Sequence, residues 1–74
     1  MEKLEKSIET YNKMAKICSD KSFVQETAYN LAYKYFEIKD KTKFENWNKE
    51  AKKWSEIENQ FTKNLKQLEI DINK

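Results

Sequence analysis

The chain has 74 residues, of which 15 are basic and 13 acidic, so its formal net charge is only +2. It contains no Gly, Pro, His or Arg, and its single cysteine is Cys18. One cysteine without histidine supplies neither a disulfide, nor a zinc ligand set, nor the usual base for a serine or cysteine nucleophile. We therefore expect a protein that is not an enzyme and that uses no metal ion and no cofactor.

The lack of Gly and Pro favours an all-α fold, because tight β-hairpin turns rely on Gly and helices do not. The length supports one domain at most, so we treat residues 1–74 as a single helical domain. No stretch approaches 18 consecutive apolar residues, and no apolar signal-peptide core follows the first residues. We therefore expect no membrane contact and a cytoplasmic location.

The first predicted helix covers residues 2–18. Apolar residues recur in it at steps of three and four, and they fall within an arc of about 120° around the helix axis. The pattern is typical of a helix that buries one narrow face. The stripe consists of Leu4, Ile8, Tyr11, Ala15 and Cys18.

The second predicted helix covers residues 23–39. It follows Ser22, which has the spacing of a capping box with Gln25. Its apolar arc is about 220° wide, almost twice that of the first helix. One stripe keeps strict 4-3-4-3 spacing, and an aromatic stripe lies beside it. The first stripe is Val24, Ala28, Leu31, Tyr35 and Ile38, and the second is Tyr29, Tyr33 and Phe36.

The third predicted helix covers residues 43–73 and follows a second capping box, from Thr42 to Glu45. Its apolar positions form one heptad-like seam that resembles a coiled coil. Glu58 interrupts this seam. The seam contains Phe44, Trp47, Ala51, Trp54, Phe61, Leu65, Leu68 and Ile72.

The lengths of these helices do not match. The third would be about 45 Å long and the first two about 25 Å each, so two short helices cannot cover all of it. It either breaks near Ser55, where an S-x-x-E pattern occurs, or pairs its last third with another copy, or leaves that third for a different partner. Because the seam stays in phase through residue 55, we favour an unbroken helix. The expected fold is a three-helix bundle with two short antiparallel helices and one long helix.

Two sets of residues are candidates for protein binding. The first is the aromatic stripe of the second helix, Tyr29, Tyr33 and Phe36, since tyrosine has a flat apolar body and a polar tip. A central helix that packs against both others would also explain this stripe. The second set, Leu65, Leu68 and Ile72, ends the long helix beyond the reach of the short ones. Trp47 and Trp54 lie one heptad apart and are expected in the core, with a groove for a ligand or partner as the alternative.

The sequence therefore predicts a small protein–protein interaction module, an inhibitor, adaptor or regulator that docks one helical face on a larger protein. Self-association as a dimer through the end of the long helix is compatible with this function. The alternative is a small DNA- or RNA-associated regulator that uses the lysines around residues 39–53. Nucleic acid is the less favoured partner, because acidic residues interleave with these lysines and arginine is absent.

Overall fold

A computed structural model describes residues 2–54 and 58–74, and side chains from residue 4 onward within these ranges. Four helices and no strand occur in the described residues: α1 (Glu2–Ile17), α2 (Lys21–Glu37), α3 (Lys41–Lys53) and α4 (Gln60–Ile72). The all-α prediction is confirmed. None of the four described helices is long and apolar enough to cross a membrane.

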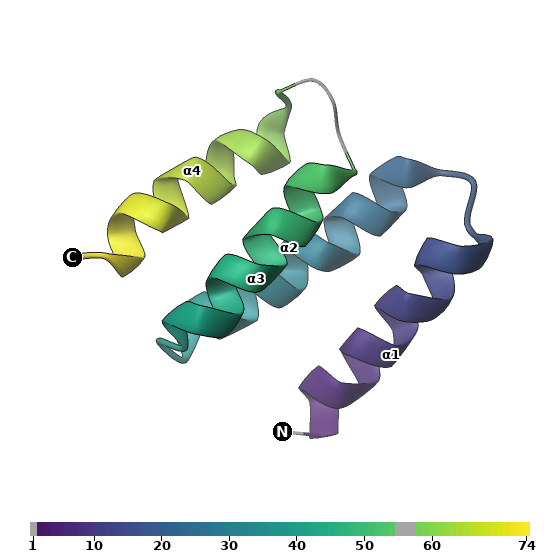
Figure 1. The fold of residues 1–74 in the computed structure, drawn as a ribbon, viewed down its shortest axis with the longest axis horizontal. Helices are drawn as coiled ribbons and strands as arrows, with labels where there is room; N and C mark the ends of the chain where they lie inside the picture. Colours follow the sequence, from purple (N-terminus) through teal and green to yellow (C-terminus); the bar gives the residue numbers. More distant parts are fainter. Residues whose placement is uncertain (1, 55–57) are drawn as a thin grey trace.

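The helices run up and down in a flat arrangement. In Figure 1, α3 lies in front of α2, with α1 on one side of this pair and α4 on the other. The Cα trace extends over 37 × 32 × 14 Å, so the molecule is thin in the direction in which α2 and α3 stack. Its accessible surface is 5412 Å², whereas a compact monomer of this mass exposes roughly 4,850 Å². The flat shape therefore exposes more surface than a compact monomer of this mass would.

The three-helix prediction is wrong, because two helices lie where one over residues 43–73 was expected. α3 ends at Lys53 with Trp54 as its C-cap, and α4 begins after Asn59. The Asn59 side chain accepts a hydrogen bond from the Thr62 amide, and the Thr62 hydroxyl accepts one from the Asn59 amide. This reciprocal capping box supplies a local reason for a new helix start. The S-x-x-E pattern at Ser55 falls on residues 55–57, which lie outside the described residues.

The predicted capping residues of the second and third helices are also wrong, by two positions. Asp20 caps α2 by accepting from the Ser22 amide, and Asp40 caps α3 by accepting from the Lys43 amide. Aspartate ranks with serine or above threonine as an N-cap. Each helix therefore begins two residues before the predicted start.

The turn between α2 and α3 contains the one described residue with positive φ, Lys39, at 64°. The Lys39 amide donates to the Phe36 carbonyl at 3.1 Å, and the Asp40 amide donates to the Tyr35 carbonyl at 3.0 Å. These two bonds form a Schellman motif, which normally places glycine in the left-handed position. Asp40 both completes this motif and caps α3, so the turn joins the two helices tightly.

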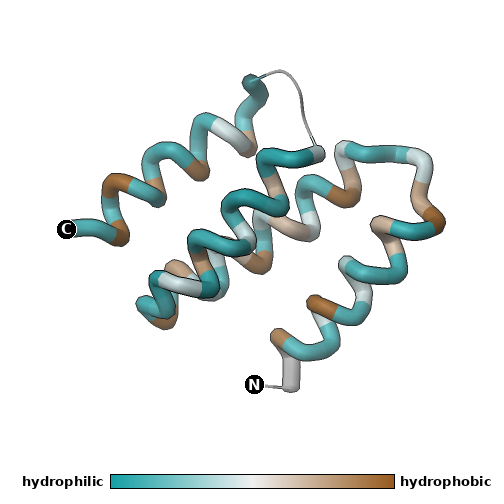
Figure 2. The backbone as a smooth tube through the Cα atoms, viewed as in Figure 1, coloured by the Kyte–Doolittle hydropathy of each residue, from teal (hydrophilic) through white to brown (hydrophobic). Residues whose placement is uncertain are grey.

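The core lies between the α2–α3 pair and the inner faces of α1 and α4. Phe44 of α3 and Leu31 of α2 are among the largest fully buried side chains. α2 contacts all three other helices, which explains why its apolar arc is so wide. Most residues of α3 are hydrophilic (Figure 2). The buried apolar residues are Tyr11, Val24, Ala28, Leu31, Ala32, Tyr35, Phe44, Ala51, Leu65 and Leu68.

Candidate protein-binding surface

Four aromatic rings form a chain of contacts that runs from α2 to α4, in the order Phe36, Tyr33, Tyr29 and Phe61. We call these four residues the aromatic surface. The ring centroids of Tyr29 and Tyr33 are 6.3 Å apart, and those of Tyr33 and Phe36 are 6.1 Å apart. Tyr29 lies 5.3 Å from Phe61, so the surface crosses from α2 to α4. All three pairs are tilted, at spacings in the range of favourable aromatic contacts.

Exposure differs sharply among these residues. Tyr33 is 41% exposed, whereas Tyr29 and Phe36 are half-buried and pack against the core. Phe36 also contacts the fully buried Phe44, at 6.0 Å between ring centroids. The aromatic surface therefore has an exposed ring supported by rings that continue into the core.

The second predicted set lies on the inner face of α4. Leu65 is fully buried, Leu68 is nearly so, and Ile72 is half-buried against the core. The structure thus brings the first set, Tyr29, Tyr33 and Phe36, together on the surface. It places the second set on the side of α4 that packs against the core. Sequence reasoning placed Phe61 on the seam but did not select it for binding, since its contact with Tyr29 depends on how α4 folds back.

A second cluster joins α1 to α3 through Tyr11. The Tyr11 hydroxyl donates to the Glu50 carboxylate at 2.5 Å and accepts from the Trp54 indole N–H at 2.7 Å. The Trp47 ring meets the Tyr11 ring edge-on at a centroid distance of 5.0 Å. Lys53 pairs with Glu50 at 3.4 Å and lies 5.4 Å from the centre of the Trp54 ring. This cluster fixes the middle of α1 against the end of α3.

Burial is the main cause, and the hydrogen bond to the Glu50 carboxylate the second, of a rise in the pKa of Tyr11 from 10.0 to about 12. The hydrogen bond from Trp54 acts in the opposite direction, because it stabilises the phenolate. The phenol therefore stays protonated at neutral pH and serves as a structural donor. Trp47 and Trp54 both pack against the core, as the core interpretation predicted.

A polar contact holds α4 against α3. Asn48 is only 2% exposed, and its side-chain amide donates to Glu69, which also pairs with Lys52 at 2.9 Å. The side-chain oxygen of Asn48, Oδ1, is buried and accepts no hydrogen bond from the described residues. A polar cavity of about 260 Å³ lies over these residues. Acidic residues and lysines both line this cavity, so its charge favours neither cations nor anions. The lining residues are Glu45, Asn48, Lys49, Lys52, Glu69 and Asn73.

The start of α4 is tied to α2 in a similar way. Gln25 is 2% exposed, and its side-chain oxygen accepts from the Asn59 side-chain amide at 2.7 Å. The N-cap residue of α4 thus bonds both to its own helix and to the central helix. Because this bond joins residues 34 apart, no local sequence pattern predicts it.

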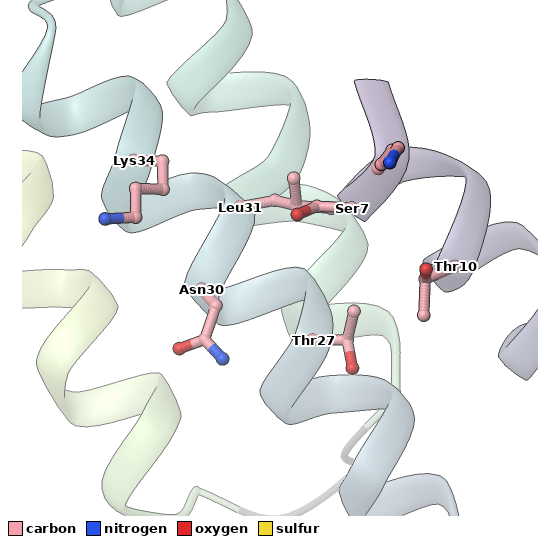
Figure 3. A pocket seen from close by; sticks show the side chains of 7 residues that line it. Ser7, Thr10, Thr27, Asn30, Leu31 and Lys34 are labelled. Atoms are coloured by element: carbon pink, nitrogen blue, oxygen red, sulfur yellow. The ribbon is translucent and has the colours of Figure 1, made fainter. Parts of the chain in front are cut away.

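A groove of about 250 Å³ lies between α1 and α2. Figure 3 shows Ser7 and Thr10 of α1 across from the α2 side chains, with Leu31 reaching between the two helices. The Lys34 ammonium points away from α1 in this view and pairs with Glu37 at 3.6 Å. The groove therefore presents hydroxyl groups together with the lysines Lys6 and Lys34 at its lining.

Within the part of the chain that the structure describes, no group of three or more His, Cys, Asp or Glu side chains is arranged to hold a metal ion. Cys18 is half-buried, and its thiol lies 3.5 Å from the Asp20 carbonyl oxygen. The thiol thus contacts a backbone carbonyl oxygen, which differs from the adjacent base that activates a nucleophilic cysteine.

Comparison with known proteins yields no match to a family model, to a curated protein or to a solved structure.

Proposed function

We propose that this chain is a small, non-enzymatic protein-binding module that docks the aromatic surface on a larger protein. The observation that carries the proposal is the run of four touching rings, in which Tyr33 remains 41% exposed. Such a module would act as an inhibitor, adaptor or regulator, because its effect would come from occupying a surface of its partner.

The way the rings are held supports this role. Tyr33 contacts Tyr29 on one side and Phe36 on the other, so its ring has neighbours that limit its motion before any partner arrives. Pre-ordered side chains lose less entropy on binding. Tyrosine is also enriched among the residues that contribute most to protein interfaces. The Lys34–Glu37 ion pair lies beside Tyr33 in sequence and gives the surface a polar edge of the kind found around interface cores.

The test is a capture experiment with the full chain, performed with and without nuclease, followed by titration of the captured protein with purified variants. We expect Tyr33→Ala to weaken binding by roughly 30-fold, which corresponds to a loss of about 2 kcal/mol at a major interface residue. Because Tyr33 is partly exposed, the variant should remain folded, and its circular dichroism spectrum would verify this.

Ile17→Ala is the matched control. Ile17 is the most exposed large apolar residue described, at 85%, and it ends α1 rather than facing α4. We expect its affinity to equal that of the wild type. Equal affinity of the Tyr33 variant and the wild type would contradict the aromatic surface as the docking site. Capture that disappears with nuclease would instead favour the DNA- or RNA-associated function.

A further inference from the structure

The cavity over Asn48 is bounded by polar side chains of α3 and α4. Its α3 members are residues 45, 48, 49 and 52, and this spacing places them on one face of the helix. Glu69 of α4 and Asn73, the C-cap of that helix, complete the lining. The four residues of the aromatic surface do not line this cavity. It is therefore a second candidate site, separate from the proposed docking surface.

The charged side chains around this cavity neutralise one another only in part. Lys52 and Glu69 form an ion pair at 2.9 Å between the two helices, and both side chains remain partly accessible. Glu45 and Lys49 form no ion pair with the described residues, although they lie four apart on α3. Residues at this spacing have Cβ atoms about 5–6 Å apart. The lining therefore combines two carboxylates and two ammonium groups at short range, and its net charge is zero.

Asn48 adds a buried acceptor that no described residue satisfies. Its side chain is almost fully buried, its amide group donates to Glu69, and its Oδ1 accepts no hydrogen bond from the described residues. A buried acceptor without a donor destabilises the structure, and a donor bound beside it removes that cost. An ammonium group has three donors, so it can bond to this oxygen and to a carboxylate at the same time. The position beside Asn48 and Glu69 therefore favours a ligand that carries an ammonium group.

The spacing of the opposite charges narrows the class of ligand. The Lys52 ammonium and the Glu69 carboxylate are 2.9 Å apart, so a complementary ligand must carry its own carboxylate and ammonium close together. α-Amino acids have this arrangement, because both groups are attached to one carbon. The cavity volume, about 260 Å³, lies just below the range of roughly 300–1,000 Å³ that is typical of drug-sized ligands. A small amino acid therefore has a suitable size, and the polar lining favours a polar side chain.

We propose that this cavity binds a free α-amino acid with a short polar side chain, as its zwitterion. The ammonium group of the ligand donates to Glu69 and to the Oδ1 of Asn48. Its carboxylate accepts from Lys52 and Lys49. The exposed carboxylate of Glu45 accepts a hydrogen bond from the side chain of the ligand. This inference goes beyond the proposed function and does not depend on it, since the two surfaces share no residue.

The test is a titration of the full-length, nitrogen-15-labelled chain with L-serine, L-asparagine and L-glutamine, followed by NMR spectroscopy. With at least one of these ligands we expect saturable shifts of the Asn48 side-chain amide signal and of the backbone amides near the cavity. N-acetyl-L-serine lacks the ammonium group, and 4-aminobutanoate carries its two charges at opposite ends of its chain. We expect each of these control ligands to bind roughly 10-fold more weakly, the effect of losing one hydrogen bond between charged groups.

A pair of lysine substitutions locates the bound ligand. Lys49→Gln removes a proposed contact with the carboxylate, and because Lys49 is exposed the variant should remain folded. We expect its affinity for the amino acid to fall by roughly 10-fold. Lys53→Gln is the matched control, because it makes the same charge change on α3 at a residue that pairs with Glu50 and does not line the cavity. Its affinity should equal that of the wild type.

Three results would overturn the proposal: no saturable shift with any of the three amino acids, equal binding of the acetylated ligand, or wild-type affinity in the Lys49→Gln variant. The same variants separate this proposal from the proposed function. Lys49→Gln should still dock on the captured protein, and Tyr33→Ala should still bind the amino acid, because no residue of the aromatic surface lines the cavity.

Discussion

α1 and α4 flank the same pair of helices, yet they are attached by different kinds of contact. α4 places Leu65 and Leu68 in the core, with Thr62 beside them. In α1, Tyr11 is the one buried residue among the described side chains, and its hydroxyl and ring make the contacts with α3. α4 therefore contributes two leucines to the buried core, whereas the one buried side chain described in α1 is a hydrogen-bonded tyrosine. Because of this difference, we expect α4 to respond most to substitutions of its buried leucines, and α1 to changes at the Tyr11 hydroxyl.

The largest expected effect is at Phe44, in the central α2–α3 pair, where its ring contacts Phe36. Its side chain is fully buried and is among the largest in the core. We expect Phe44→Ala to destabilise the fold by about 3–5 kcal/mol, because it removes a large apolar group and leaves a cavity. Urea unfolding followed by circular dichroism measures this. An unchanged unfolding curve would show that Phe44 is not buried in the core.

Leu65→Ala should act through α4. Leu65 is fully buried, and we expect a loss of roughly 3 kcal/mol in the free energy of unfolding. Ile70→Ala is the control on the same helix, because Ile70 is 56% exposed and should change stability by no more than about 0.5 kcal/mol. Equal losses for the two variants would mean that α4 is not docked through its inner face.

Alkaline pH should act through α1. The folded state raises the pKa of Tyr11 from 10.0 to about 12, so the stabilisation from the protonated phenol is complete below pH 10 and is lost as pH rises toward 12. In the Tyr11→Phe variant, residue 11 has no ionisable group, while all lysines of the wild type are retained. The variant therefore serves as the control for the titration of the other groups. The stability gap between wild type and variant should therefore shrink across this range, and a constant gap would contradict the assignment.

The smallest of the α1 effects is the loss of the Tyr11 hydroxyl at neutral pH. Tyr11→Phe leaves the ring contact with Trp47 but removes the bonds to Glu50 and Trp54. We expect a loss of about 1–2 kcal/mol. Because both tryptophans adjoin Tyr11, their fluorescence should change more than the circular dichroism signal. A change of equal size in both signals would mean that α1 does not respond separately.

Sequence periodicity predicted the bounds of the first two helices to within two residues, because each has an apolar stripe. It failed at the break before α4 for a physical reason. The stripe continues in phase across residues 54–59, while the local stop signal is a less familiar N-x-x-T capping box at Asn59 and Thr62. The preference for aspartate at the other two caps outweighed the more conspicuous Ser22 and Thr42 patterns.

The candidate site was partly predictable for the same reason. Tyr29, Tyr33 and Phe36 share one side of α2 by helical spacing alone, so their proximity follows from the sequence. The contact between Tyr29 and Phe61 depends on α4 turning back. The Tyr11–Glu50 hydrogen bond joins residues that are 39 positions apart. The sequence pattern predicts Tyr11 in the core and Glu50 in contact with solvent, so it does not predict this bond. Such pairs arise only from tertiary packing.

The left-handed Lys39 in the turn between α2 and α3 has a kinetic consequence. This conformation costs a residue with a side chain roughly 1–2 kcal/mol, and the chain has no glycine to avoid that cost. Among the helix pairs of the described structure, α2 and α3 share the most extensive contact, and they are adjacent in sequence. Contacts between segments that are adjacent in sequence form early in folding. The rate of folding is therefore expected to depend on entry into this turn.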